Sequence, residues 1–551
     1  MMLGRDTRGR REWRSGSHES DEAKSSEAKE RFPHPFVVRA EKPTSGLWAP
    51  RAIVELKMYQ LSATLREKPD WWRKAMDPEI RQKWFEEAKT QQADVEERWR
   101  LTDNMINYTL GELEGYAALR DDETGIEMRA ALQAAVKPLE DVPENEKDWH
   151  PGSNDQVLDL VHPSLYPLVY MQTYAKLPDG NLGTIDPPDL EYDSDGNVCL
   201  MFISERFQWL PSDFAVRATA ALVPALERIM ARAVPMWERV LSDLRRGEMP
   251  VRLGPIVHSD MRRGTQTGLA CIWPEHRGAP WPDDADEQML YEEAAADAWY
   301  ATQPKRLPDS PARYDGALSA LAEPVYSLRD RTIQVIVKLA NIVLTPEKPE
   351  YPGGKWHVEG MRNESIVSTF IYYYDSDNIR DTRLAFRQAT AEPMYHEQYD
   401  SYCMKTLYGM DRDVACAQDV GTIATKEGRC IAFPNLYQHK VSPFELADRT
   451  RPGVRKILVF FLVDPTRRIP SATEVAPQQE AWLKDTLYNA GDDSHLSKLP
   501  VELLDVHTSM TPGIMNKEEA LKVREQLMRE RTVDIGYGEE FFTYTFNMCE
   551  H

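Results

Sequence analysis

The sequence predicts an α+β protein in which a large helical region precedes an antiparallel β sandwich or jelly roll. Two observations support this fold class. In the first part of the chain, apolar residues recur every three or four positions, which is typical of amphipathic helices. After about residue 330, β-branched and aromatic runs are separated by turn-rich connections with few helices between them, which is typical of antiparallel sheets.

The helical part follows a polar N-terminal segment. Residues 1–36 are dominated by Arg, Ser, Glu and Lys, and we expect them to be disordered. Helical spacing of apolar residues then covers 46–140, and a long amphipathic helix is expected at 212–246. The acidic segment 283–297 contains no basic residue and is expected to form one solvated helix face.

Strand signals are concentrated later in the chain. A hairpin with a turn at Asp195-Gly196 is expected within 190–203. Runs rich in β-branched and aromatic residues predict four further strands, and a helix is expected near the end. The four strands are at 332–345, 365–375, 430–433 and 454–464, and the helix is at 516–531.

These patterns divide the chain into four parts. They are a disordered tail at 1–36, a mostly helical region at 37–315 that packs on the β core, the β core at 316–470, and a C-terminal extension with a helix at 471–551. The β core carries every motif on which a function can be argued.

Composition excludes several classes of partner. With 67 Lys+Arg against 89 Asp+Glu in 551 residues, the formal net charge is -22, which disfavours nucleic acid and anionic membranes as main partners. The longest apolar run, 457–463, is far below the ~20 residues of a membrane span. Six cysteines without a CxxC pair indicate reduced thiols, so we expect a cytoplasmic protein; the oligomeric state stays open.

Three side chains have the types and spacing of a metal site. His357 and Glu359 are two positions apart, so in an extended segment both point to the same side. His439 follows a short predicted strand and is the best candidate for a third ligand. Two His and one carboxylate, with positions left open, form the facial triad of non-haem Fe(II) oxygenases.

A buried arginine accompanies these ligands. In the strand at 454–464, Arg455 begins a row that continues with apolar residues and is therefore predicted to face the core. A buried guanidinium needs an anion, ideally a carboxylate in bidentate geometry. The partner is either an acidic side chain of this chain or the carboxylate of a bound 2-oxoglutarate, unless the arginine extends from the end of the strand into water. Lys338, Asn341, Tyr351, Tyr372 and Tyr374 are further candidates near the metal, whereas Trp356 is expected to serve packing.

The order of these motifs resembles the Fe(II)/2-oxoglutarate-dependent oxygenase superfamily. The matching pattern is H-x-E, then a distant Phe-Pro-x(4)-His-x-Val-x-Pro, then Gly-x-Arg at the start of a hydrophobic strand. In addition, Tyr351-Pro-Gly-Gly is similar to a motif that precedes the first metal ligand in prolyl-hydroxylase-like members. The residues are His357, Glu359, Phe433, Pro434, His439, Val441, Pro443, Gly453 and Arg455. The resemblance implies a double-stranded β-helix, a jelly roll, as the catalytic core.

The same resemblance implies the cofactors. Fe(II) would be held by His357, Glu359 and His439, with 2-oxoglutarate and O2 as co-substrates. The co-substrate site would include Arg455, Tyr351 and Arg451.

A narrower resemblance covers most of the chain from about 40 to 510. The segments 334–364, 207–211 and 464–470 are similar to a family of large fungal proteins catalogued as a domain of unknown function. This resemblance implies oxidation of an aliphatic C–H in an amino acid or specialised metabolite, by hydroxylation, desaturation or oxidative ring closure.

The sequence departs from the usual superfamily pattern and leaves two other functions open. The carboxylate ligand is Glu where Asp is usual, and Arg449 and Arg451 are rivals of Arg455 as the co-substrate anchor. A zinc hydrolase could use the same two His and one Glu. A non-catalytic barrel that binds or scaffolds a partner is the other alternative.

Overall fold

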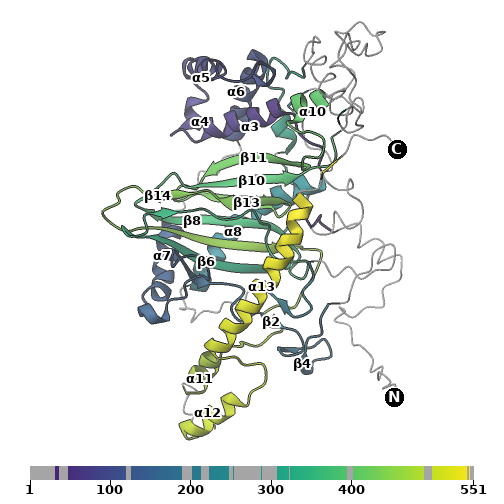
Figure 1. The fold of residues 1–551 in the computed structure, drawn as a ribbon. Coiled ribbons are helices and arrows are strands. Elements are labelled where there is room, and N and C mark those ends of the chain that lie inside the picture. Colours follow the sequence, from purple (N-terminus) through teal and green to yellow (C-terminus); the bar gives the residue numbers. More distant parts are fainter. Residues whose placement is uncertain are drawn as a thin grey trace, which may run out of the picture.

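The structure of the chain is a computed structural model (Figure 1). It describes residues 31–35, 48–118, 126–188, 202–211, 222–246, 252–253, 287, 307–321, 323–393, 401–488, 499–542 and 545–546. The hairpin expected at 190–203, the acidic segment at 283–297 and nearly all of the expected tail at 1–36 lie outside the described residues.

Helices form the first part of the described chain and return at its end. Local sequence sets their limits: α5 begins where the Asp77 carboxylate accepts the N–H groups of Glu79 and Ile80, with Pro78 in the first turn. The α-helices are α3 (Ile53–Arg66), α4 (Trp71–Lys74), α5 (Pro78–Gln91), α6 (Asp103–Ala118), α7 (Ile126–Glu140), α8 (Leu222–Arg245), α10 (Ser401–Tyr408), α11 (Glu480–Tyr488), α12 (Val501–Ser509) and α13 (Lys517–Phe542), and the short 3-10 helices are Glu97–Trp99, Glu144–Glu146 and Ala317–Leu321.

Antiparallel strands make up the centre of the molecule. The strands are β1 (Val157–Val161), β2 (Leu168–Val169), β3 (Tyr174–Lys176), β4 (Leu182–Thr184), β5 (Phe207–Gln208), β6 (Val335–Leu344), β7 (Glu350–Tyr351), β8 (Ile366–Asp377), β9 (Ile379–Arg380), β10 (Arg383–Ala389), β11 (Ala417–Ala424), β12 (Cys430–Pro434), β13 (Tyr437–Val441), β14 (Phe444–Leu446) and β15 (Gly453–Val463). Five of them form a large sheet in the order β1-β6-β15-β8-β12, and β11-β10-β13 form a smaller one.

The large sheet has two buried faces with different neighbours. On its outer face, side chains such as Val337, Tyr372 and Phe460 pack on α7 and α8 in one apolar cluster. On its inner face, Ile336 and Phe461 join a second cluster with residues of β10 and β12. Burial on both faces explains why the strands are nearly continuous apolar runs.

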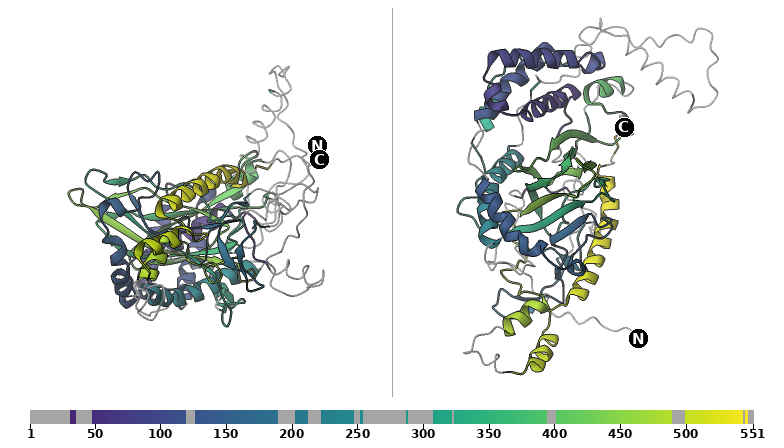
Figure 2. Two further views of the ribbon diagram at one scale, coloured as in Figure 1. Left: turned by 90° about the horizontal axis from the view of Figure 1, so that it is seen from below. Right: turned by 90° about the vertical axis from the view of Figure 1, so that its left-hand side faces the viewer.

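Helix α13 covers the inner side of the sheets. Val523 and Leu527 of this helix belong to the inner-face cluster, and in Figure 2 α13 lies on the opposite side of the sheets from α7 and α8. The helix expected at 516–531 is thus confirmed, and it continues to Phe542. The four expected strands of the β core are also confirmed as β6, β8, β12 and β15.

The prediction of mixed helix and sheet is confirmed, with two differences. The described strands form separate hydrogen-bonded sheets and no closed barrel. The region expected to be mostly helical also contains β1, which pairs with β6 because its apolar residues complete the edge of the large sheet. The helix expected at 212–246 is described as α8, from Leu222 to Arg245.

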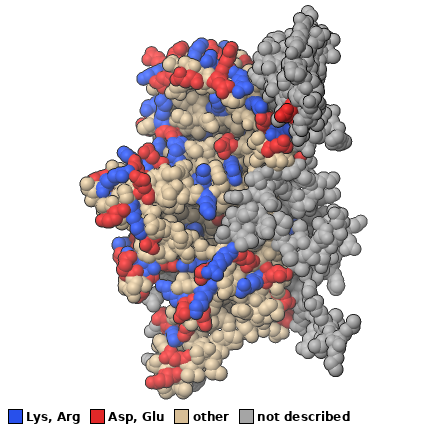
Figure 3. All heavy atoms as spheres, in the orientation of Figure 1, with Lys and Arg blue, Asp and Glu red and all other residues tan. Residues whose placement is uncertain are grey.

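The visible face of the molecule has no large patch of a single charge, and no described helix is long and apolar enough to cross a membrane. Acidic and basic side chains are interspersed on the visible face (Figure 3). No described helix combines the length and the apolarity that a membrane crossing needs.

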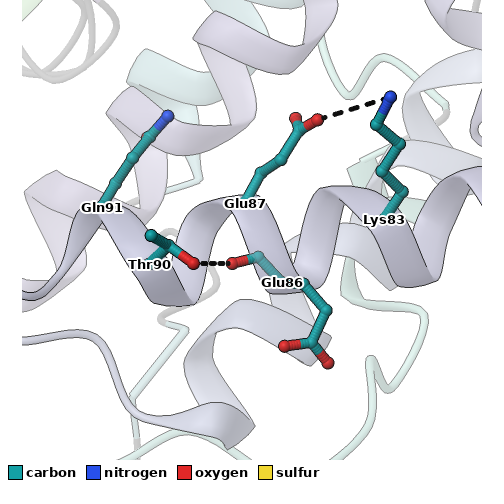
Figure 4. A pocket seen from close by; sticks show the side chains of 5 residues that line it. All are labelled: Lys83, Glu86, Glu87, Thr90 and Gln91. Atoms are coloured by element: carbon teal, nitrogen blue, oxygen red, sulfur yellow. Dashed lines mark hydrogen bonds and ion pairs between the residues drawn. The ribbon is translucent and has the colours of Figure 1, made fainter.

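A shallow pocket on α5, lined by exposed polar residues, lies beyond β11 and apart from the strands that carry the candidate metal ligands (Figures 1 and 4). Its lining residues are Lys83, Glu86, Glu87, Thr90 and Gln91.

Candidate metal centre

Backbone pairing brings the first and last candidate ligands together. His357 and His439 form an isolated antiparallel bridge, with hydrogen bonds of 3.2 Å from the His357 N–H and 3.0 Å from the His439 N–H. His439 itself belongs to β13, where it pairs with Phe386 of β10. The segment of His357 therefore extends the smaller sheet past β13, and Glu359 follows two residues later on the same side.

The three side chains have the spacing that a metal ion requires. Glu359 Oε1 lies 3.3 Å from His439 Nε2 and 3.6 Å from His357 Nε2. Ligand bonds of about 2.1 Å place neighbouring donor atoms about 3 Å apart. All three donor atoms lie within 4.8 Å of one another, so a single ion could contact all of them.

A buried asparagine fixes the backbone of the carboxylate ligand. Asn435, which is 1% exposed, accepts the Glu359 N–H at 2.9 Å and donates to the Glu359 carbonyl at 2.9 Å. Its amide also donates to the Ile366 carbonyl at 3.1 Å, at the start of β8. The sequence pattern does not reveal this clamp, because Asn435 occupies a variable position of Phe-Pro-x(4)-His.

Hydrogen bonds set the charge of the three groups. Burial opposes ionisation of Glu359, but the two histidines outweigh it and hold the pKa of Glu359 well below its usual value. Burial lowers the pKa of His439, with the charge of His357 as the next cause. His357 Nδ1 donates a hydrogen bond to the Lys355 carbonyl at 2.9 Å, so neutral His357 carries its proton on Nδ1. Burial opposes protonation of His357, but the hydrogen bond and charge of Glu359 outweigh it and raise the pKa of His357.

Arg455 lies on the inner face, as its row in the strand predicts. The side chain is 1% exposed, and Nη2 donates to Thr425 Oγ1 at 3.1 Å. Tyr373 is a neutral neighbour, with its ring centroid 4.6 Å from Cζ. Among the described residues, no carboxylate lies within ion-pair distance of this guanidinium, and burial lowers its pKa. A buried cation in neutral surroundings is the arrangement of an anion site.

The other arginines named as anchors lie elsewhere. Arg451 is exposed and pairs with Asp377 at 2.7 Å, and Arg449 is exposed and pairs with Glu350 at 2.6 Å. Tyr351, in contrast, is half-buried on β7, and the charge of Arg455 partly offsets the rise in Tyr351 pKa that burial causes. The structure therefore brings Tyr351 and Arg455 together and places Arg449 and Arg451 in surface ion pairs.

The remaining candidates are separated by the faces of the large sheet. Tyr372 and Tyr374 belong to the outer-face cluster with α7 and α8. Asn341 is also on that face, because its amide donates to Glu140 of α7 at 2.8 Å. These three residues point away from the ligands, because side chains alternate between the two faces along a strand. The sequence does not show which of the two alternating sets of side chains faces inward. Lys338 lies on the inner face, opposite Val459.

Trp356, beside the first ligand, is held by two cations. The Arg387 guanidinium lies 5.0 Å from its ring centroid, and the Lys440 ammonium lies 4.6 Å from it. This arrangement agrees with a packing role.

A buried ion pair connects α13 to the loop of the ligands. Arg531 of α13 donates to Glu364 Oε1 at 2.6 Å, and its guanidinium lies 3.8 Å from the ring centroid of Trp209. Glu364 is fully buried and also accepts the N–H groups of Met361 and Trp209. The residues that follow Glu359 are therefore fixed by a helix from a distant part of the sequence.

A second cluster of similar composition lies beside β1, and no sequence pattern points to it. His150, Asp159 and His162 have donor atoms within 4.8 Å of one another. Asp159 is opposite Ala340 of β6, so it shares the inner face of the large sheet. The spacing of these three residues matches no short metal motif, and the structure alone brings them together.

Hydrogen bonding in this second cluster favours a polar network over a metal site. His150 Nδ1 lies 2.8 Å from Asp159 Oδ2, which is a hydrogen-bond distance, and the Ser164 N–H points at His162 Nδ1 at 3.2 Å. That contact places the proton of neutral His162 on Nε2. Burial lowers the pKa of His162 to about 3, and Arg524 lies 3.8 Å from Asp159 Oδ2, where its charge would repel a cation.

Solved structures resemble the chain only weakly. One is titled "Selenomethionine labeled Fe(II)/(alpha)ketoglutarate-dependent dioxygenase TqaL", with a TM-score of 0.17 and 13% identity; the match covers 30% of this chain and 56% of that chain. Another is titled "Crystal structure of IDO from Bacillus thuringiensis", with a TM-score of 0.15 and 9% identity over 33% of this chain and 86% of that one. At these TM-scores neither likeness carries an argument. No curated protein matches the chain.

Family models match most of the sequence. A model described as "Domain of unknown function DUF4246, N-terminal" matches residues 11–87. A second model, described as "Protein of unknown function (DUF4246)", matches residues 113–486, which include both clusters and Arg455. The chain therefore belongs to the DUF4246 family.

Proposed function

We propose that this protein is a non-haem Fe(II)/2-oxoglutarate-dependent dioxygenase that oxidises an aliphatic C–H of a small molecule. The observation that carries the proposal is the pairing of a two-His, one-Glu cluster with a buried arginine that has no carboxylate partner among the described residues. A cluster of this kind with open positions suits Fe(II), and a buried guanidinium suits the far carboxylate of 2-oxoglutarate.

The strand order supports a jelly-roll core for the same proposal. From β6 onward, the chain passes from the large sheet to the His357 segment beside the smaller sheet and back to β8. It then runs through β10 and β11 of the smaller sheet, returns to β12, crosses to β13 and ends in β15 of the large sheet. Repeated crossing between two facing antiparallel sheets is how jelly rolls are built.

Each residue of the site has a distinct part in this function. His357, Glu359 and His439 would hold the metal, and the hydrogen bond to the Lys355 carbonyl keeps His357 Nε2 free of its proton. Arg455 would bind the co-substrate, with Tyr351 beside it. Bound Fe(II), with 2-oxoglutarate and O2, supplies an oxidant able to remove hydrogen from an aliphatic C–H. Apolar side chains of the inner face and of α13 form the interior behind this site.

Anaerobic spectroscopy tests this function directly. Fe(II) and 2-oxoglutarate added to the purified chain should produce the visible metal-to-ligand charge-transfer band, and His439→Ala should abolish it. A featureless spectrum in the wild-type chain would contradict the proposal.

A matched pair of arginine variants tests the co-substrate anchor. Arg455→Leu should weaken 2-oxoglutarate binding by about 10-fold to 100-fold, the value of one to two charge-assisted hydrogen bonds. Arg449→Leu removes an exposed arginine that pairs with Glu350 and Glu445 and should leave the binding unchanged. Equal effects of the two variants would remove Arg455 from the site.

The same preparation separates the zinc hydrolase from the oxygenase. A hydrolytic zinc site has no use for a second carboxylate anchor, so 2-oxoglutarate should not bind near Arg455 in that case. Tightly bound zinc together with absent 2-oxoglutarate binding would favour the hydrolase, and absence of both ligands would favour a non-catalytic role.

A further inference from the structure

The inner face of the large sheet carries a second cation, Lys338, far from Arg455. Strand register places Lys338 opposite Val459 and Ile342 opposite Arg455. Lys338 and Ile342 are four positions apart on β6, which at ~3.3 Å per residue is about 13 Å along the strand. The two cations therefore start from well-separated positions on the inner face.

The surroundings of Lys338 make its charge costly unless an anion is bound. Its neighbours on the inner face, Ile336 and Val459, belong to the apolar cluster between the sheets. The side chain is half-buried in the middle of β6, where it cannot extend fully into water. Within the described part of the chain, no ion pair or hydrogen bond engages its ammonium group.

Asp159 shares the inner face with Lys338 and could serve as its counter-ion, yet other groups already engage the Asp159 carboxylate. Its Oδ2 accepts a hydrogen bond from His150 at 2.8 Å and lies 3.8 Å from Arg524. The charge of Lys338 is felt at Asp159 and contributes to its low pKa of about 2, but the two groups do not form an ion pair within 4.0 Å. The second cluster thus borders the lysine without neutralising it.

Lys338 also adjoins the candidate metal centre. The apolar cluster around Lys338 also contains Phe386 and Phe433, whose ring centroids lie 6.4 and 4.9 Å from that of His439. The His357 side chain is 37% exposed, so solvent reaches this side of the cluster, whereas His439 is 5% exposed. The solvent-exposed side of the ligand cluster, on the same inner side as an ammonium with no described counter-ion, is where a substrate would enter.

We propose that Lys338 binds a carboxylate of the substrate, at a subsite separate from the one in which Arg455 binds the co-substrate. The inference rests on the proposed function, because it takes Arg455 to be occupied by 2-oxoglutarate. It narrows the substrate class to small molecules that carry an anionic group. His150, Asp159 and His162 form the polar wall of this subsite on the side of β1.

Acetate and acetamide, two probes of nearly equal size, test the subsite. With Fe(II) and saturating 2-oxoglutarate present, calorimetric titration with acetate should show binding to the wild-type chain, and acetamide should not bind. Lys338→Met keeps the length and apolar stem of the side chain and should weaken acetate binding by about tenfold or more. Lys338→Arg should retain the binding because it retains the charge.

The two proposals fail in different ways in this experiment. If the visible band never forms, the oxygenase function is wrong. If the band forms with equal strength in wild type and Lys338→Met, the function stands and only the acetate titrations judge the subsite. Absence of acetate binding to the wild type, or equal acetate affinity in Lys338→Met, overturns the role of Lys338.

Discussion

This protein contains two clusters of two histidines and one carboxylate, and the clusters differ in their hydrogen bonding. In the first cluster, His357 Nδ1 donates a hydrogen bond to the Lys355 carbonyl. The Nε2 atoms of His357 and His439 lie 3.6 and 3.3 Å from Glu359 Oε1. In the second, the contact between His150 and Asp159 is already a hydrogen bond of 2.8 Å.

The difference shows that residue types alone do not make a metal site. A metal ligand needs a free lone pair directed at the shared point and a field that accepts positive charge. In the first cluster Glu359 is ionised between the two imidazoles, and the Nδ1 hydrogen bond of His357 favours the tautomer whose Nε2 faces the carboxylate. In the second cluster, the positive charges of Arg524 and Lys338 already interact with the negative charge of Asp159 and so disfavour an added cation.

Removing one histidine from each cluster should give the largest contrast. His439→Ala should weaken Fe(II) binding by more than about 100-fold, because even outer partners of metal ligands are worth 10-fold to 100-fold. His150→Ala should leave one Fe(II) per chain. Metal titration under anaerobic conditions measures both, with circular dichroism as the check on folding. If wild type binds a second ion that His150→Ala does not bind, then the second cluster is also a metal site and the proposed difference between the clusters is wrong.

The clamp on Glu359 should have the next largest effect. Asn435→Ala removes the hydrogen bonds that fix the Glu359 backbone and should weaken Fe(II) binding by about 10-fold to 100-fold, as loss of an outer-shell partner does. Asn378 is a matched control, because it is also buried and clamps the Asp448 and Arg451 carbonyls in a distant turn. Similar metal affinities for Asn435→Ala and wild type would show that the backbone holds its shape without the clamp.

The second cluster should be visible in the pH dependence of stability. Burial lowers the pKa of His162 to about 3 in the folded state, from 6.5. Between these values the unfolded chain binds more protons, so stability falls as the pH decreases. From about pH 6 to pH 4, wild type should lose about 1.4 kcal/mol per pH unit more than His162→Gln.

Denaturant unfolding at several pH values measures this difference. His34 has a similarly lowered pKa of about 3, but it is present in both proteins and cancels. Parallel stability curves for wild type and His162→Gln would mean that His162 titrates like an exposed histidine.

The β core is well predicted by the sequence because its signals are local. Strands such as β6 and β15 are continuous apolar runs, and the alternation along β15 is enough to assign Arg455 to the inner face, where it is buried. The same alternation does not show whether the odd-numbered or the even-numbered residues of β8 face inward. The prediction that Tyr372 and Tyr374 lie near the metal is therefore wrong, because both pack on α7 and α8.

Long-range pairing explains what the sequence does not reveal. A local antiparallel contact between residues 148–150 and 157–159 brings His150 and Asp159 together. The long-range pairing of β1 with β6 then places Asp159 on the same inner face as Lys338. The Asn435 clamp and the Arg531–Glu364 pair likewise join distant segments. The roles of His357, Glu359 and His439 stay predictions, although the structure brings the three together.

The pair between Arg531 and Glu364 also has a consequence for the order of folding during synthesis. Glu364 leaves the ribosome 167 positions before Arg531, so the loop after the metal ligands is made long before its cation. A carboxylate that is fully buried in the finished protein is costly to bury unpaired, which favours an open loop in the nascent chain. The loop around Glu364 should therefore close only after α13 has been translated.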